Sequence, residues 1–277
     1  MNNIKSCLML FLALSFAFPL FALAQQPLIQ QVANGEINWG DQVIRATGSG
    51  APNPDAPNIA AARLGAERAA KADALRNILE TVKGVRIDSE TLVVNAMTQN
   101  DVIRTQVQGI VKGARVVNTK YLSDGAVEVM LEIPMAGPLT QTLLPPTSFG
   151  TQPVPKVGDL VYTGVIFDCR GLNLRPAMSP KVVDEEGREV YGSAFVSQEW
   201  ATKFGIVGYV KDLAAAQKND RISNPPKPAN PITLKGLKVT GVGSSDIVIS
   251  NADAQGLKDM SKNLSFLEQC RVLVVVD

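Results

Sequence analysis

The sequence predicts an α+β protein of two mixed domains, the first being a long helix packed on a small antiparallel sheet. Three observations lead to this prediction: a helical segment at 58–83 with strand patterns on either side of it, a proline-rich stretch between 134 and 155, and further apolar β-like runs after that stretch. The expected organisation is a signal peptide at 1–24, a first domain at 25–135, a proline-rich linker at 136–157 and a second domain at 158–277.

The N-terminus has the three parts of a secretory signal. Lys5 precedes an apolar run from Leu8 to Leu23, and the small residues Ala22 and Ala24 stand just before Gln25. We expect cleavage between Ala24 and Gln25. A retained membrane anchor is the alternative, because the run nearly reaches the length of a spanning helix.

Two further features of the leader bear on its fate. Pro19 and the Ala-Leu-Ala ending favour cleavage over a retained anchor. Cys7 precedes the apolar run instead of following it, so lipidation at this cysteine is not expected.

The first domain opens with a pair of strands, or one bent strand, around Gly40-Asp41, between Ile37 and Thr47. A long helix follows over 58–83, with Asn58 as the N-cap and Gly84 where a glycine commonly ends a helix. Small residues dominate its first half, so we expect close packing there against another backbone. Its predicted apolar stripe consists of Ala61, Gly65, Ala72, Leu75, Leu79 and Val82.

A shorter helix is expected at 99–110, and a hairpin after it. Segments 114–122 and 127–133 alternate apolar and polar residues on either side of Ser123-Asp124-Gly125. That period of two predicts a half-buried antiparallel sheet.

The second domain begins with a continuous apolar segment, Leu160 to Phe167, which predicts a central strand. The remaining elements are predicted as a hairpin at 181–191, short helices at 197–204 and 211–218, strands at 237–240 and 246–250, a helix from Asn251 to about Leu267, and a closing strand at 270–276.

Two cysteines remain after cleavage of the signal, Cys169 and Cys270, and export would place them where disulfides persist. A bridge between them would tie the end of the chain to an early strand of the same domain. Two buried free thiols are the alternative, because the sequence does not give the Cα separation that a bridge requires.

The composition excludes several kinds of chemistry. The chain contains no histidine, which removes the commonest general base and metal ligand. After cleavage, 253 residues remain with 26 basic and 26 acidic side chains, and this balance is not that of a nucleic-acid-binding protein. Two distant cysteines are too few for a structural zinc site, and no glycine motif matches a nucleotide-binding loop. We therefore predict no metal, no cofactor and no catalytic residue.

Two polar groups in the sequence are candidate sites. Asp168, Arg170 and Arg175 lie around the end of an apolar strand, where an ion pair is the favoured interpretation. The run 184–186 places three acidic residues before a glycine, and a turn is favoured over a calcium site because the spaced ligands of a calcium loop are missing. Trp39 and Trp200 are isolated aromatic residues, interpreted as core or interface packing.

Several blocks of the first domain resemble the Lpp-twenty lipoprotein-like family. They lie at 67–88, 102–105, 109–117 and 124–129, and the resemblance covers about residues 36–135. It implies a compact α/β module without assigned catalysis, among relatives that include envelope lipoproteins and flagellum-associated proteins of the FlgP kind. Many relatives are lipidated, whereas the residue directly after the expected cleavage site of this chain is Gln25 and not a cysteine.

These observations predict an exported, non-enzymatic envelope protein, in the periplasm or at the periphery of the outer membrane. Its role would be structural or in assembly, with envelope or flagellar proteins, or further copies of itself, as partners. The alternative is a periplasmic module that binds a small molecule or a glycan, with the proline-rich segment as a hinge. A hydrolase that uses carboxylates is a third hypothesis, but the sequence pairs no two acids for it.

Overall fold

The computed structural model describes residues 28–144, 146–150, 162–223, 229–259 and 265–277. The predicted signal peptide and its cleavage site at Ala24 and Gln25 lie outside the described residues. Helices and strands are mixed in both halves, and the long helix α1 packs on an antiparallel sheet, which confirms the predicted α+β class. Among the described residues no helix is both long and apolar enough to cross a membrane.

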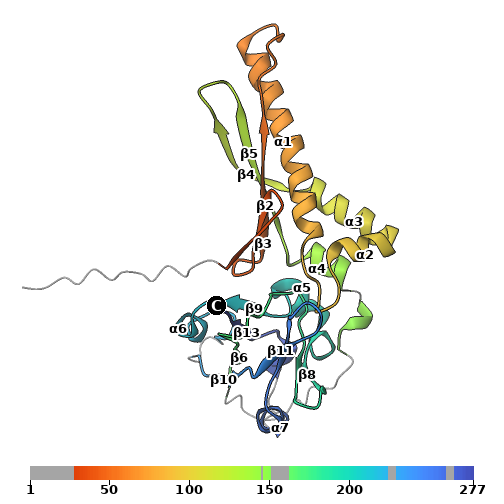
Figure 1. Ribbon diagram of the computed structural model, residues 1–277, viewed down its shortest axis with the longest axis vertical. Coiled ribbons are helices and arrows are strands. Elements are labelled where there is room, and N and C mark those ends of the chain that lie inside the picture. Colours follow the sequence, from red (N-terminus) through yellow and green to blue (C-terminus); the bar gives the residue numbers. More distant parts are fainter. Residues whose placement is uncertain (1–27, 145, 151–161, 224–228, 260–264) are drawn as a thin grey trace, which may run out of the picture.

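The first domain is a five-stranded antiparallel sheet with one face covered by helix α1 (Figure 1). The strand order is β1-β2-β3-β5-β4, so β1 and β4 form the two edges. The elements are β1 (Ile29–Val32), β2 (Gly35–Asn38), β3 (Val43–Gly50), α1 (Ile59–Lys83), α2 (Val93–Gln99), α3 (Asp101–Lys112), β4 (Arg115–Tyr121) and β5 (Val127–Pro134).

Helix α1 begins and ends where the sequence predicts. The side chain of Asn58 accepts a hydrogen bond from the amide of Ala61, and Gly84 is the C-cap. The predicted apolar stripe is wrong in part, because Gly65 and Ala72 are exposed. The residues that are buried along the helix are Ala66, Ala70, Ala74, Ile78, Thr81 and Val82.

Direct contact between helix and strand backbones selects this buried face. Gly48 and Gly50 of β3 lie under α1, and a β-carbon at Gly48 would overlap the backbone of Ala70 and Ala74. A β-carbon at Gly50 would overlap the backbone of Ala66 and Ala70 in the same way. Only alanines spaced four residues apart, facing glycines, allow so short a separation. This confirms the close packing that the small residues predict.

The second domain contains a parallel sheet and a mixed sheet, each of four strands. The parallel sheet has the order β10-β6-β13-β9, and the mixed sheet has the order β11-β12-β7-β8. Its elements are β6 (Gly164–Asp168), β7 (Val182–Val183), β8 (Glu189–Tyr191), α5 (Gln198–Phe204), β9 (Gly208–Val210), α6 (Leu213–Gln217), β10 (Pro231–Lys235), β11 (Lys238–Thr240), β12 (Asp246–Val248), α7 (Asn251–Asp259), α8 (Ser265–Glu268) and β13 (Val272–Val275), with a 3₁₀ turn at Ser193–Phe195.

The predicted linker is not irregular throughout. Residues Pro138–Leu143 form helix α4, followed by a 3₁₀ turn at Pro146–Ser148. Pro138 stands in the first turn of α4, where a proline leaves no helical hydrogen bond unmade. Leu139 and Leu143 of α4 are buried, so this part of the chain belongs to the folded core.

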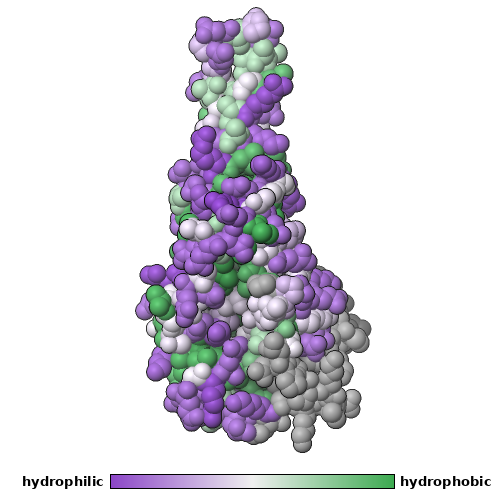
Figure 2. Space-filling model, turned by 90° about the vertical axis from the view of Figure 1, so that its right-hand side faces the viewer, coloured by the Kyte–Doolittle hydropathy of each residue, from purple (hydrophilic) through white to green (hydrophobic). Residues whose placement is uncertain are grey.

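The first domain stands on the second as a narrow projection. Figure 1 shows the β4–β5 hairpin and the first half of α1 extending away from the second domain, and Figure 2 shows a slender upper part above a broad base. We call residues 47–70 and 117–130 the arm. Because the alanines of α1 lie in its upper half, the contact with β3 continues into the arm.

Removal of this contact gives a test of the fold. We predict that Gly48→Ala lowers the free energy of unfolding by at least about 2 kcal/mol, because a packed backbone must move to admit the methyl group. Gly65→Ala is the matched control, since Gly65 lies in α1, the helix that packs on Gly48, and nothing lies within 4 Å of the added carbon. We expect that change to stabilise the protein by roughly 0.5–1 kcal/mol. Urea denaturation measures the free energy of unfolding of both variants. An equal change in the two would contradict the close packing of α1 on β3.

Candidate functional site

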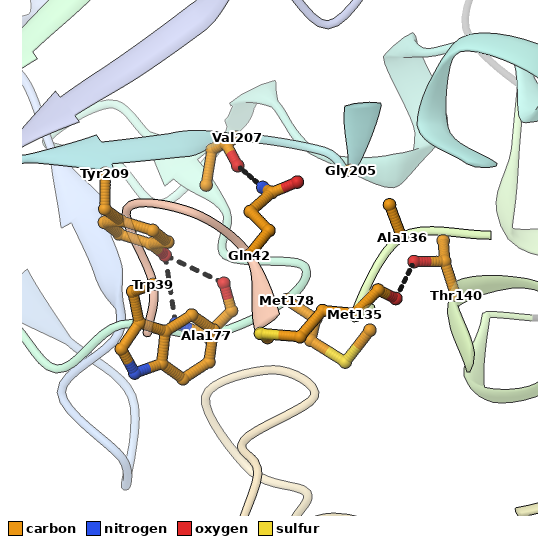
Figure 3. A pocket seen from close by; sticks show the side chains of 10 residues that line it. All are labelled: Trp39, Gln42, Met135, Ala136, Thr140, Ala177, Met178, Gly205, Val207 and Tyr209. Atoms are coloured by element: carbon orange, nitrogen blue, oxygen red, sulfur yellow. Dashed lines mark hydrogen bonds between the residues drawn. The ribbon is translucent and has the colours of Figure 1, made fainter. Parts of the chain in front are cut away.

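The two domains meet along a continuous buried core. Trp39 of the first domain is 1% exposed and contacts Tyr209 of β9 edge to face, with ring centroids 5.7 Å apart. The side chain of Gln42 donates a hydrogen bond to the carbonyl of Val207 at 2.8 Å (Figure 3). These contacts confirm the interpretation of Trp39 as core or interface packing.

Main-chain hydrogen bonds cross the same interface. The amides of Met178 and Ser179 donate to the carbonyls of Arg86 and Ile87 at 2.9 and 2.7 Å, and Gly243 donates to Ser89 at 2.6 Å. Main-chain bonds of this kind, together with the shared core, fix the two domains against each other. A hinge that opens at this interface would have to break them.

Two hollows adjoin the interface, and the inner one is very small. The space between Trp39, Met135, Met178 and Tyr209 is about 20 Å³, which admits a single water molecule and no larger ligand (Figure 3). The hydroxyl of Tyr209 donates to the carbonyl of Ala177 and accepts from its amide, so the polar atom beside this space already has partners.

The outer hollow is a groove of about 160 Å³ between the turn at Gly40-Asp41 and the start of β9. Arg221 lines it, but its guanidinium donates to the carbonyls of Phe204, Gly205 and Cys270 at 2.6–2.8 Å. Burial lowers the pKa of Arg221. The cation therefore joins the end of α5 to the start of β13, and its role is structural.

The polar groups singled out in the sequence are also held by local contacts. Arg170 pairs with both carboxylate oxygens of Asp168, at 2.8 and 2.6 Å, which confirms an ion pair at the end of β6. That hydrogen bonding holds the pKa of Asp168 below its usual range. The side chain of Arg175 makes no hydrogen bond or ion pair with the described residues, while its amide donates to the carbonyl of Ser244. Asp184 accepts from the amides of Glu186 and Arg188, as the predicted turn requires.

Of the two alternatives for Cys169 and Cys270, the structure shows two buried free thiols and no bridge. Strands β6 and β13 are parallel with Val165 opposite Val272, so Cys169 follows one end of the pair and Cys270 precedes the other. Six residue positions separate them along the strands, or about 20 Å. A disulfide needs Cα atoms no more than about 7 Å apart.

Thiol labelling tests whether Cys169 and Cys270 are free thiols. Burial raises the pKa of each thiol to about 12, so neither forms the reactive thiolate at neutral pH. We predict that a thiol reagent leaves both unlabelled in the folded chain and labels both after denaturation without a reductant. A denatured chain that takes up label only after reduction would show that the bridge exists.

The open face of the first sheet carries charges that neutralise one another. Glu132 of β5, with a side chain only 5% exposed, lies between Arg45 of β3 and Arg115 of β4. Its oxygens accept from Arg45 at 2.8 Å and from Arg115 at 3.1 Å, and Arg45 also lies 3.6 Å from Glu36 of β2. The four side chains form a ladder across four strands, so this face is stable without a covering layer.

The ladder keeps Glu132 ionised. Burial alone would raise the pKa of its carboxyl, but hydrogen bonds from Arg115 and Arg45 outweigh burial and lower it. The stability that results is present above the ordinary pKa of a glutamate and is lost as the pH falls through the lowered value. The alternating pattern of Val127–Pro134 predicts that the acidic residues of this strand share one face of the sheet. The sequence alone does not predict which arginines pair with them.

The edge of the sheet in the arm is the exposed strand β4. All of its residues but Thr119 are exposed, and its other side has no neighbouring strand among the described residues. Four large apolar side chains lie at its ends: Val116 is 47% exposed, Val117 39%, Tyr121 49% and Leu122 43%. Arg63 of α1 stacks on the Tyr121 ring at 4.2 Å and so holds this side chain in place. An unpaired strand edge of this kind is a template for another strand.

Fold and surface together define a rigid two-domain protein whose arm presents an open strand edge. Residues 42–134 match the family model described as LPP20 lipoprotein, and residues 164–277 match the model described as the second domain of Treponema pallidum Tp0624. The first domain is therefore similar to the LPP20 lipoprotein family, which confirms the family resemblance of that domain. No curated protein matches the chain. The family match supports an exported, lipoprotein-like protein of the cell envelope.

Proposed function

We propose that this protein is a structural or assembly component of the bacterial envelope, and that it contacts other proteins through the arm. The open edge of β4 carries the proposal. Seven residues of an edge strand, six of them exposed and several β-branched or aromatic, lie on a projection that the alanine–glycine contact holds rigid. The LPP20 match and the predicted signal peptide support a place in the periplasm or at the outer-membrane periphery.

The interface between the domains gives less support to a ligand-binding role. Its inner hollow admits one water molecule, and Arg221 in the outer groove already bonds to three carbonyls. A hinge at the proline-rich segment would also have to separate the bonds made by Arg86 and Ile87. We therefore favour assembly over ligand capture.

Photo-crosslinking in intact cells tests the proposal. A photo-reactive phenylalanine analogue at Tyr121 is expected to capture envelope proteins, because that ring lies beside the open edge. The matched control places the analogue at Val102 of α3, which is 63% exposed but lies away from β4. Fractionation of a tagged chain is expected to place it in the envelope.

Two results would contradict this proposal: a chain found in the cytosol with its leader attached, or equal crosslinking from the two positions. A flagellar connection is the narrower form of the proposal and rests on the FlgP-kind relatives. A deletion strain with normal motility would remove that form and leave the envelope role standing.

A further inference from the structure

The exposed strand β4 has a pattern that is complementary to itself. Read from Val116 to Leu122, it runs Val-Val-Asn-Thr-Lys-Tyr-Leu, with two large apolar residues on each side of a polar centre. In an antiparallel pair of identical strands centred on Thr119, Val117 lies opposite Tyr121 of the second copy. These two exposed apolar residues, one at each end of β4, thereby become partners of one another.

From this pattern we propose that two copies of the chain associate through their β4 edges, antiparallel and centred on Thr119. The inference rests on the proposed function, because it names the occupant of the same edge. A two-fold axis at Thr119 joins the two five-stranded sheets into one. Residues directly opposite share a face of a sheet, so both α1 helices lie on the same face of the joined sheet.

The charges of β4 select this register. Centred on Thr119, the pair places Lys120 opposite Asn118 of the second copy, and Arg115 lies beyond the bulge, so no like charges meet. Centring on Lys120 would place the two lysines opposite each other, which is destabilising. Centring on Asn118 would place Lys120 opposite Val116 and separate the apolar ends.

The other edge of the sheet is a weaker candidate. Strand β1 has four residues, Ile-Gln-Gln-Val, against seven in β4. A β-bulge between Val116 and Asn118 interrupts β4, and bulges limit edge pairing. The regular pairing with β5 resumes at Asn118 and continues to Tyr121, which contains the proposed centre.

Register-specific disulfides test the proposal in the full chain. The background is Cys7→Ser, and the buried Cys169 and Cys270 are kept because their raised pKa makes them unreactive. Thr119→Cys places two thiols opposite each other, with Cα atoms about 4.5 or 5.5 Å apart, within disulfide reach. Val117→Cys or Tyr121→Cys alone places like thiols about 14 Å apart, whereas a mixture of the two variants brings unlike thiols together.

We expect Thr119→Cys, and the mixture of Val117→Cys with Tyr121→Cys, to form covalent dimers at least about tenfold faster than Val102→Cys, because pairing raises the local thiol concentration. Val117→Cys alone and Tyr121→Cys alone are expected to match the Val102→Cys control. Circular dichroism of each variant confirms that it folds. Thr119→Cys that oxidises no faster than Val102→Cys overturns the proposal, and so does equal oxidation of all variants.

A second pair of variants separates the proposal from the function on which it rests. Val117→Lys is expected to give monomers in analytical ultracentrifugation, while Ile29→Lys on β1 leaves the dimer intact. If Thr119→Cys does not crosslink but the envelope adducts of Tyr121 persist, the self-pairing is wrong and the assembly role stands. If neither the Thr119→Cys crosslink nor the envelope adducts of Tyr121 appear, both the self-pairing and the assembly role are wrong.

Discussion

The contact between Ala66, Ala70 and Ala74 of α1 and the glycines of β3 is the constraint on which the rest of the structure depends. It lets helix and sheet approach closely enough to exclude any side chain between their backbones. A larger residue on either side would move α1 outward and open the core beneath it. The arm can therefore be slender and still carry a stable strand edge far from the second domain.

The second constraint is the interface that makes two domains into one core. Trp39 and Tyr209 fill its centre, and main-chain hydrogen bonds to the carbonyls of Arg86 and Ile87 fix its rim. These contacts leave no room for a ligand of useful size in the inner hollow, and they join the arm firmly to its base. The base then orients the arm, and β4 presents a fixed edge to a partner.

Much of the fold could be predicted from the sequence because local chemistry determines it. Asn58 caps α1, the turn before β5 closes a hairpin, and period-two patterns mark the strands of the first domain. The face of α1 could not be predicted from hydropathy, because alanines lie on every side of its first half and only the glycines of β3 decide which are buried. The state of Cys169 and Cys270 stayed open for a similar reason, since their separation depends on the parallel register of β6 and β13. The role of Arg221 was also missed, because its acceptors are carbonyls of distant residues and no side-chain pattern marks them.

Residue-resolved amide hydrogen exchange in native conditions measures the central claim, that the alanine–glycine contact holds the arm rigid as part of the core. The account predicts that the amides of Ala70 and Ala74 exchange as slowly as that of Ile78 nearer the base, and that Ala66 follows them closely. Exchange in the arm that is faster by orders of magnitude than at Ile78 would show that the arm opens independently, and it would contradict the account.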